Sequence, residues 1–277
     1  MKAWRWMAPA VAVLVVVTVV PIGRVLWTSL HRSNLTAPDQ ADRVWFDNYV
    51  NIATSREWWL AVAATLVLVA AIVLVQVVLG CVFAAALNRW TRAWPVARAV
   101  VLLPLALLSI VGVVVWRDAA TTGFIVSWFG TGEPGQIGSQ IGSLIAVSMA
   151  EIWRGTGLVV VVVAVALARV PDTLVAAAMA DGATGRQRWS RVVMPSIGPA
   201  LAAIATFRVL DTFRVLDGPL LVDQADSAVR TAPVLLWNTQ FTEFELGLGA
   251  AMSILLLLIG VALTAVVVPL LRVRRAL

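Results

Sequence analysis

Long apolar runs separated by short polar segments dominate the chain from end to end. Six of these runs reach the roughly 20 residues that a helix needs to cross a bilayer; they span 7–30, 59–87, 96–115, 144–168, 197–216 and 246–271. Apolar residues surround the second, third and sixth runs on every side, so length and lack of charge indicate the spans better than any amphipathic period does. The pattern predicts an all-α membrane protein, a single domain over 1–277 with six transmembrane helices.

The first run has a second interpretation, because Lys2 and Arg5 precede an apolar stretch as they would in a secretory signal. The stretch is long, Pro9 and Pro21 bracket it, and no small-x-small cleavage site follows it. We therefore expect the first span to be retained.

Composition agrees with a membrane location and excludes several classes of protein. Hydrophobic residues make up 61% of the 277 positions and charged residues 13%, whereas soluble domains are about 25% charged. Cys81 and His31 are the only residues of their kinds, which excludes an internal disulfide and a Cys/His metal site. No phosphate-binding loop or dinucleotide fingerprint occurs. We expect a chain that is not an enzyme, binds no cofactor and takes its energy from another subunit.

Basic residues are distributed unevenly between the two sides of the predicted membrane. With the N-terminus inside, twelve Lys and Arg residues fall in inner segments and five in outer loops, whereas eleven of the 15 acidic residues fall outside. Inner loops of membrane proteins are enriched in Lys and Arg, so both termini are predicted to be cytoplasmic. The net charge of +6 then reflects orientation, and no nucleic-acid partner is expected.

One predicted inner loop, 169–195, has the pattern of two short helices joined by a turn. Asp172 follows Pro171 at a favourable helix start, and good helix formers come next. Gly182 is placed to end this helix, because glycine readily adopts the left-handed conformation of a C-cap. A second short helix from about Gly185 carries three basic residues, Arg186, Arg188 and Arg191. By these features alone, the loop could be an amphipathic hairpin that rests on lipid head groups.

The same loop resembles the coupling loop of permease subunits in ATP-binding-cassette (ABC) importers, whose motif is approximately E-A-A-x-x-D-G-A, an aromatic residue, then L-P. The matching residues are Ala177, Ala178, Asp181, Gly182, Ala183, Trp189 and Pro195. Met194 replaces the leucine, and Ala176 stands where the motif has glutamate. In that family the loop docks on the ATPase, so the resemblance implies that Ala176, Arg186 and the matching residues lie at that contact. The missing carboxylate implies weaker or differently arranged docking.

Four further segments resemble elements of sugar permeases in this family, and the resemblance covers nearly the whole chain. They are Phe46-Asp47-Asn48-Tyr49, Arg98 to Pro104 with Trp116-Arg117, Trp153-Arg154-Gly155-Thr156-Gly157, and Phe207 to Asp217 with Leu216 where phenylalanine is usual. The chain looks most like the A-type subunits of maltose, trehalose and glycerol-phosphate importers. The resemblance implies the type I importer permease (MetI-like) fold.

The resemblance also implies an assembly and a cargo. Such a permease pairs with a second homologous permease in a heterodimer, binds two copies of a cytoplasmic ATPase that holds ATP and Mg²⁺, and receives solute from an extracytoplasmic binding protein or lipoprotein. The implied location is a bacterial cytoplasmic membrane, in contact with lipid. A disaccharide such as trehalose is the expected cargo, and glycerol phosphate, a glycerophosphodiester or an amino sugar is the alternative.

Two alternatives lie outside the family. A secondary transporter would work without an ATPase, and the Asp181-Gly182-Ala183 turn argues against it. A membrane scaffold that transports nothing would show no substrate-stimulated ATP hydrolysis.

Charged residues occur inside the fourth and fifth predicted spans, although a charge at the bilayer centre costs at least about 2.5–3.5 kcal/mol. Two sets repeat at a spacing of three residues: Glu151 and Arg154, and Arg208, Asp211, Arg214 and Asp217. Residues three apart on a helix are neighbours on its surface, so these faces are expected to meet protein or water. Arg154 and Arg208 fall near the predicted midplane, where transporters commonly bind substrate.

Two interpretations of these charges remain open. The residues that could line or gate the translocation path are Glu151, Trp153, Arg154, Arg208 and Asp211, since indole rings cover the C–H surfaces of sugars while Arg and Asp bind hydroxyls. Alternatively, they form a structural ion-pair network between the two spans. Arg214 and Asp217 lie closer to the outer end and are candidates for an outer gate. Gln76 in the second span is interpreted as a packing residue.

Overall fold

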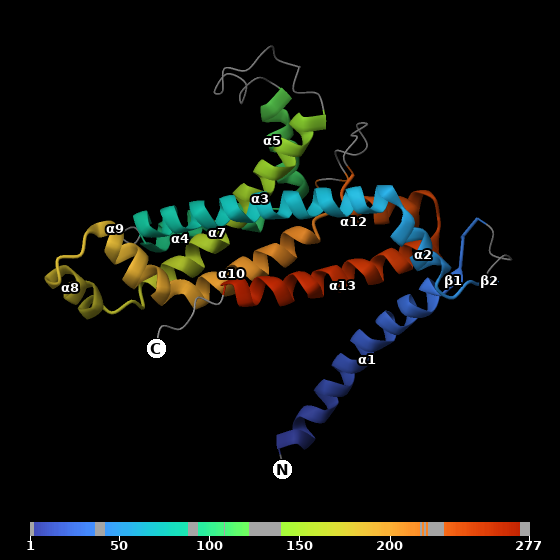
Figure 1. Cartoon of the computed structure of the whole chain (residues 1–277), viewed down its shortest axis with the longest axis horizontal. Coiled ribbons are helices and arrows are strands. Elements are labelled where there is room, and N and C mark those ends of the chain that lie inside the picture. The colour runs from blue at the N-terminus through green and yellow to red at the C-terminus, as the bar shows by residue number, and fades with distance from the viewer. Residues whose placement is uncertain are drawn as a thin grey trace. The chain divides into compact units, whose positions relative to one another are not determined.

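The computed structural model describes residues 3–36, 42–87, 94–107, 109–121, 140–216, 218, 220 and 230–271, and helices make up most of them (Figure 1). Contacts divide the chain into two compact units, of which the first comprises Met1–Ala63 with Thr231–Val261 and the second Ala64–Arg230 with Ala262–Leu277. Two long helices, α3 (Arg56–Leu87) and α13 (Leu246–Leu271), contribute residues to both units.

The first unit combines helices with one short hairpin. Its elements are α1 (Ala3–Ser29), β1 (His31–Arg32), β2 (Asp42–Arg43), α2 (Asp47–Thr54), α12 (Ala232–Trp237), the π-helical turn η5 (Asn238–Thr242), and parts of α3 and α13. The strands pair antiparallel, with His31 opposite Arg43. The buried Asn48 side chain donates to the carbonyl oxygens of Ser29 (2.8 Å) and His31 (3.2 Å), which ties α2 to the end of α1.

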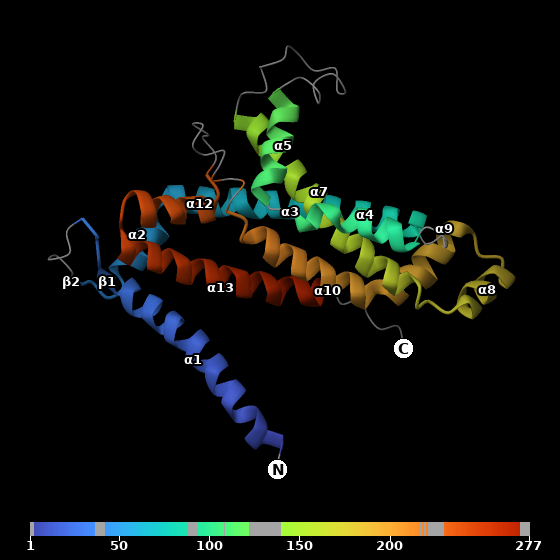
Figure 2. The same ribbon diagram turned by 180° about the vertical axis from the view of Figure 1, so that it is seen from behind.

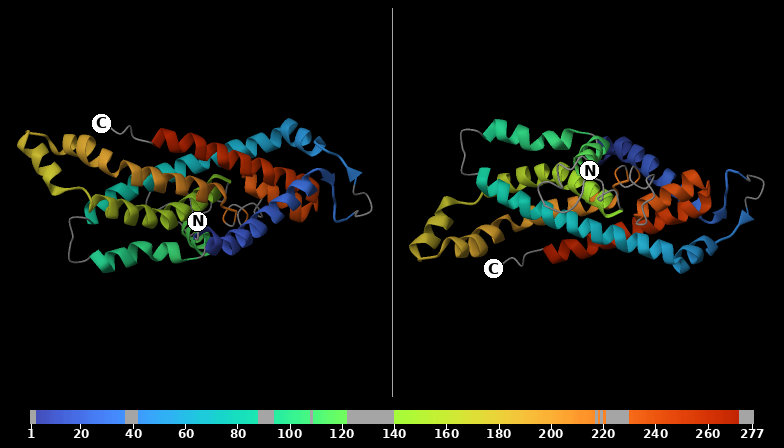
Figure 3. Two further views of the ribbon diagram at one scale, coloured as in Figure 1. Left: turned by 90° about the horizontal axis from the view of Figure 1, so that it is seen from below. Right: turned by 90° about the horizontal axis from the view of Figure 1, so that it is seen from above.

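The second unit is a helical bundle centred on α7 (Gln140–Leu167). α7 contacts α4 (Trp94–Ala106), α5 (Ser109–Thr121) and α10 (Met194–Phe213), as Figure 2 shows from behind. Cys81, Val159, Val163 and Ile197 are buried in its core, where α3, α7 and α10 meet. At one end of the α7 and α10 pair lie α8 (Asp172–Ala180) and α9 (Gly185–Arg188) (Figure 3).

Each of the six predicted spans coincides for most of its described length with one helix or, for the third, with two. Within the part of the chain that the structure describes, four helical segments are long and apolar enough to cross a membrane: Arg56–Leu87, Ile145–Leu167, Gly185–Phe213 and Leu246–Val267. A pair of shorter helices would make a fifth span, and α1 contains the shorter apolar segment Val13–Ser29. Helices this long and apolar satisfy their backbone hydrogen bonds internally, as a lipid environment requires.

The third predicted span, 96–115, is not the single helix that its hydropathy suggested. It consists of α4 and α5, and the segments Ala99–Ala106 and Ile110–Ala119 are bent by 99° with respect to each other. Pro104 lies in the last turn of α4, where it lacks the N–H that would bond the carbonyl four residues earlier. The turn that follows is held by the Leu107 amide, which donates to the Pro104 carbonyl oxygen at 3.3 Å.

The inner loop folds as two short helices joined by a glycine turn, so this prediction is confirmed. α8 starts directly after Pro171, and Gly182 has a φ of 78°, in the left-handed region. The amides of Gly182 and Ala183 donate to the carbonyl oxygens of Met179 (3.0 Å) and Ala178 (2.9 Å). This pair of hydrogen bonds is the Schellman C-cap, and glycine at its left-handed position adds no steric strain.

α9 begins with a capping box, a feature that its T-x-x-Q spacing reveals. The backbone N–H of Gln187 donates to Thr184 Oγ1 at 3.4 Å, and the backbone N–H of Thr184 donates to Gln187 Oε1 at 2.8 Å. One π-helical turn, η4 (Trp189–Val193), then leads without interruption into α10. The loop is therefore joined to the membrane-spanning part of α10 by continuous helix.

Candidate functional site

Charged and amide side chains from three helices of the second unit meet at one place in the bundle. α7 supplies Glu151 and Arg154, α10 supplies Arg208 and Asp211, and α3 supplies Gln76. These five residues are called the ion cluster below.

The buried half of the ion cluster, which consists of Gln76, Glu151 and Arg208, is closed to solvent. Arg208 is fully buried, and its Nε donates to Gln76 Oε1 at 3.0 Å, while its Nη1 pairs with Asp211 Oδ2. Its Nη2 lies 3.7 Å from Glu151 Oε2. The Gln76 amide nitrogen also donates to the backbone carbonyl oxygen of Glu151 at 2.7 Å. Removing one partner of such a buried pair costs about 3–5 kcal/mol, so Arg208 holds α3, α7 and α10 together.

The outer half of the ion cluster, meaning the solvent-accessible pair Arg154 and Asp211, is partly open. The Arg154 side chain is 20% exposed and that of Asp211 is 23% exposed, whereas that of Glu151 is 2% exposed. Arg154 binds Glu151 with two nitrogens, at 2.9 and 3.2 Å, and its Nη2 lies 3.6 Å from Asp211 Oδ2. The Arg154–Asp211 pair is thus wider than a hydrogen bond, and both groups have some access from outside the protein.

Gly155 leaves the space that the buried half requires. A Cβ at this position would lie 2.6 Å from Cζ of Arg208 and would collide with the Gln76 amide nitrogen. The glycine in the W-R-G-T-G segment therefore lets the guanidinium and the amide approach the α7 backbone.

The structure brings together most of the predicted path residues. Glu151 and Arg154 pair on one helix face, as their spacing predicted. Arg154 also reaches Asp211 on α10, so an ion-pair network between the fourth and fifth spans exists. Trp153 instead lies edge-to-face against Trp116 of α5, with ring centroids 6.5 Å apart.

The ladder predicted on the fifth span is shorter than its spacing suggested. α10 ends at Phe213, and Arg214 occupies the C-cap, so the span does not continue as a helix to residue 216. The Arg214 side chain is 77% exposed, with its Nη2 3.8 Å from Asp211 Oδ1. Asp217 lies outside the described residues. Unfavourable exposure of carbonyls at the helix end is relieved by turn bonds, such as Arg214 N–H to Asp211 O at 3.3 Å.

Gln76 was interpreted as a packing residue, and its fully buried place among α3, α7 and α10 agrees with a structural role, but its hydrogen bonds within the ion cluster were not predicted. It is fully buried and joins Arg208 to the α7 backbone through both ends of its amide. The signal was its isolation: a lone amide in a long apolar helix needs partners, because an unsatisfied buried amide costs free energy. Thr212 is a second residue missed by sequence reasoning, and its hydroxyl lies 3.5 Å from Arg208 Nη2.

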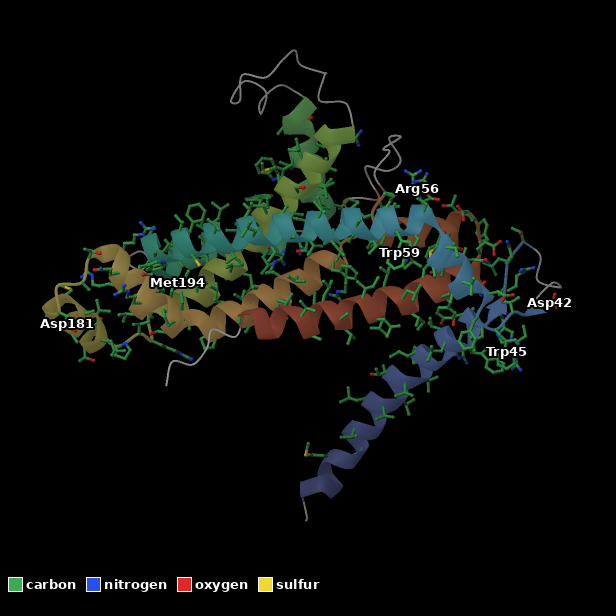
Figure 4. All side chains as sticks on the ribbon, in the orientation of Figure 1. Asp42, Trp45, Arg56, Trp59, Asp181 and Met194 are labelled. Atoms are coloured by element: carbon green, nitrogen blue, oxygen red, sulfur yellow. The ribbon has the colours of Figure 1, made fainter. Side chains whose placement is uncertain are left out.

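The residues predicted to contact an ATPase form a surface on α8 and α9. The exposed ones are Ala176, Ala177, Asp181, Gly182 and Arg186, and the partly buried ones are Ala178, Ala183 and Trp189. Leu174 and Met179 are also exposed on α8. Figure 4 shows Asp181 on the loop and Met194 where α10 begins.

Trp189 has a different place from the other loop residues. It packs against the buried core cluster of the second unit together with Val193 and Met194. The exposed residues of the loop are therefore attached to the bundle through an apolar anchor. No group of three metal-ligating side chains occurs among the described residues.

Comparison with solved structures identifies the fold. No family model matches the chain. A chain of a bacterial alginate ABC transporter, solved with an alginate pentasaccharide-bound periplasmic protein, aligns with a TM-score of 0.76 over 98% of this chain and 94% of that one, at 15% identity. A second structure, a bacterial ABC transporter involved in the import of alginate, aligns with a TM-score of 0.72 over 99% and 100% at 16% identity. The fold is that of an ABC importer permease.

Sequence comparison is more specific. The trehalose transport system permease protein SugA of Mycobacterium tuberculosis is 34% identical over 92% of this chain and 83% of its own length. The trehalose/maltose transport system permease protein MalF of Thermococcus litoralis is 27% identical over 96% and 92%. An inner membrane ABC transporter permease protein of Escherichia coli, YcjO, is 30% identical over 76% and 74%. The chain belongs to the family of carbohydrate ABC-transporter permeases, and it is a multi-pass membrane protein that serves as a translocation subunit.

Proposed function

We propose that this permease carries trehalose or a closely related disaccharide, and that the outer half of the ion cluster contacts the sugar on its path. The observation that carries the proposal is the contrast between the two halves. Arg208 and Glu151 are buried, whereas Arg154 and Asp211 keep about a fifth of their side-chain surface exposed. Trehalose is proposed because the names of the relatives SugA and MalF describe them as trehalose and trehalose/maltose transport permeases.

A sugar suits this arrangement because it offers neutral hydroxyl groups. A hydroxyl can accept from the Arg154 guanidinium and donate to the Asp211 carboxylate, whose facing atoms are 3.6 Å apart. Both groups are held from behind by Glu151 and Arg208, so they need little reorganisation when the sugar arrives.

The proposed assembly follows the family. The chain pairs with a second homologous permease in a heterodimer, and an extracytoplasmic binding protein delivers the sugar. Two copies of a cytoplasmic ATPase dock on the coupling loops and hold ATP and Mg²⁺, while this chain binds no cofactor. Both termini lie in the cytoplasm of a bacterium, in agreement with the excess of Lys and Arg in the segments on that side.

ATP-driven closure of the ATPases would move the exposed surface of α8 and α9. The helix continues from α9 through η4 into α10, where Arg208 and Asp211 lie. A displacement of the loop is therefore passed to the residues that face the ion cluster, and the anchored Trp189 keeps the two parts from moving independently.

The test is sugar uptake into proteoliposomes that contain the complete transporter and its binding protein. We expect uptake of labelled trehalose or maltose, and little of glycerol 3-phosphate or glucosamine. Arg154→Gln should reduce uptake about tenfold, the equivalent of one lost charge-assisted hydrogen bond, while the complex still assembles. Arg32→Gln is the control, because that arginine is exposed on the hairpin of the first unit and belongs neither to the ion cluster nor to the loop.

Two results would contradict the proposal. Uptake of glycerol 3-phosphate in preference to any sugar would refute the cargo. Wild-type uptake in Arg154→Gln would leave the ion cluster a purely structural network.

A further inference from the structure

A cluster of aromatic and basic side chains lies in the first unit, at the end of α1 and on the adjoining hairpin, far along the chain from the ion cluster. Its members are Trp27, His31, Arg43 and Trp45. We propose that this cluster binds the phosphodiester of a membrane phospholipid, with Arg43 as the residue that contacts the phosphate.

The Arg43 guanidinium contacts two indole rings. Its guanidinium carbon lies 5.2 Å from the ring centroid of Trp27 and 4.8 Å from that of Trp45. Trp27 also faces the His31 ring at 4.9 Å, and His31 Nδ1 lies 2.7 Å from the Trp27 carbonyl oxygen. A cation–π contact uses the flat face of the guanidinium, so the N–H groups at its edge stay available as donors. The arrangement thus presents donors in a fixed direction.

No carboxylate is paired with Arg43 among the described residues. The hairpin register explains this, because His31 is opposite Arg43 while Arg32 is opposite Asp42. Successive side chains of a strand point to opposite faces, so Asp42 and Arg32 share one face and Arg43 shares the other with His31. Among the described residues of the two strands, the face that carries Arg43 and His31 therefore has no acidic side chain.

The exposure of several aromatic residues is the reason to assign this cluster to the level of lipid head groups. Trp27 and Trp45 are 59% and 57% exposed, and Phe46 and Trp59 of the same unit are exposed as well. Figure 4 shows Trp45 beside the end of α1, with Asp42 on the hairpin. Exposed Trp and other aromatic side chains gather where a membrane meets water, and the anion present there is the lipid phosphodiester.

The backbone at Trp45 has an unusual conformation that fixes the position of its side chain. Its φ is 51°, in the left-handed region that bulky residues seldom adopt. The strain is held by hydrogen bonds from the Val44 and Trp45 amides to the Leu30 carbonyl oxygen, both 3.0 Å. A conformation that costs about 1–3 kcal/mol and is fixed in this way is often associated with function.

The inference goes beyond sugar transport: it rests on the membrane location of the family and does not depend on the cargo or on the ion cluster. Its test is native mass spectrometry of the purified transporter titrated with dioleoylphosphatidylglycerol. Arg43→Gln should weaken one lipid-binding event about tenfold, in keeping with the loss of a charge-assisted pair. Arg32→Gln, on the opposite face of the same hairpin, should leave that event unchanged.

Two further arms identify the ligand. Monogalactosyl diacylglycerol, which has no phosphate, should bind wild type and Arg43→Gln equally weakly, and inorganic phosphate should not displace phosphatidylglycerol from wild type. Equal loss in both arginine variants would mean general surface charge and would overturn the proposal. So would displacement by inorganic phosphate, or wild-type affinity in Arg43→Gln. If that variant keeps its lipid but loses stimulation of ATP hydrolysis by the binding protein, the cluster docks a protein instead.

Discussion

The sharpest test of the ion cluster is a single methyl group at Gly155. In Gly155→Ala the new Cβ would lie 2.6 Å from Cζ of Arg208 and would also collide with the Gln76 amide. Neither neighbour can move away freely, because Arg208 and Gln76 are both fully buried and bonded to each other at 3.0 Å. The substitution must therefore displace the guanidinium or the α7 backbone.

The cost can be worked out from these contacts. Overpacking a filled interior costs about 1–3 kcal/mol, and loss of one hydrogen bond to a charged group adds about 1.5–3 kcal/mol. Together they give about 4 kcal/mol, close to the value for breaking a buried ion pair. For a chain of this size we expect the melting temperature to fall by about 10 °C.

The assay is thermal unfolding of the purified complex, followed by uptake measurements at a temperature where it stays folded. Gly112→Ala in α5 is the matched control, since its Cβ would meet only the Cβ of Ala150 at 3.7 Å, an ordinary contact. It should be neutral or slightly stabilising, because alanine favours the helix over glycine.

A second variant separates a collision from other effects. Adding Gln76→Ala to Gly155→Ala removes one of the colliding groups, so the two changes should destabilise less together than the sum of their separate effects. If Gly155→Ala melts with the wild type, or if the two effects simply add, the close packing of the cluster around Gly155 is incorrect.

Three more substitutions test the cluster and the loop. Gly182→Val should leave ATP hydrolysis unchanged but reduce uptake, because a β-branched residue resists the φ of 78° at the turn after α8. Gly182→Asn is the control and should show nearly normal uptake. Normal uptake in Gly182→Val would contradict the proposed role of this turn in coupling. Ala176→Glu, at an exposed position of α8, should strengthen binding of the ATPase about threefold to tenfold, as for an added surface or partly buried contact, which titration of the ATPase onto the permease measures. Arg208→Ala should destabilise the complex by about 3–5 kcal/mol, so a normal melting temperature would show that Arg208 is not the residue that joins the three helices.

The loop illustrates how far local sequence carries. The glycine turn at Gly182 and the start of a second helix at about Gly185 were predicted, because a C-cap glycine acts only on its neighbours along the chain. The pairing of Glu151 with Arg154 was predictable for the same reason, since three residues separate them on one helix.

The third span shows where hydropathy fails. Its apolar run is long enough for a membrane helix, and hydropathy does not distinguish one straight helix from two that meet at a bend of 99°. Pro104 was a signal for a break, but the direction that the chain takes after it depends on what α4 and α5 pack against. Both contact α7, which the order of residues does not reveal.

The sequence by itself determined where the apolar helices lie, the glycine turn between α8 and α9, and the family, because each depends on composition or on residues close together in the chain. Only the tertiary structure decided which charges meet. Arg208 bonds Gln76 across 132 residues, and Gln76 bonds the Glu151 carbonyl across 75. α3 is apolar on every side, so its sequence does not specify which face turns inward. The rotation of that helix is set by packing against α7 and α10 and by the need of a buried amide and a buried guanidinium for each other.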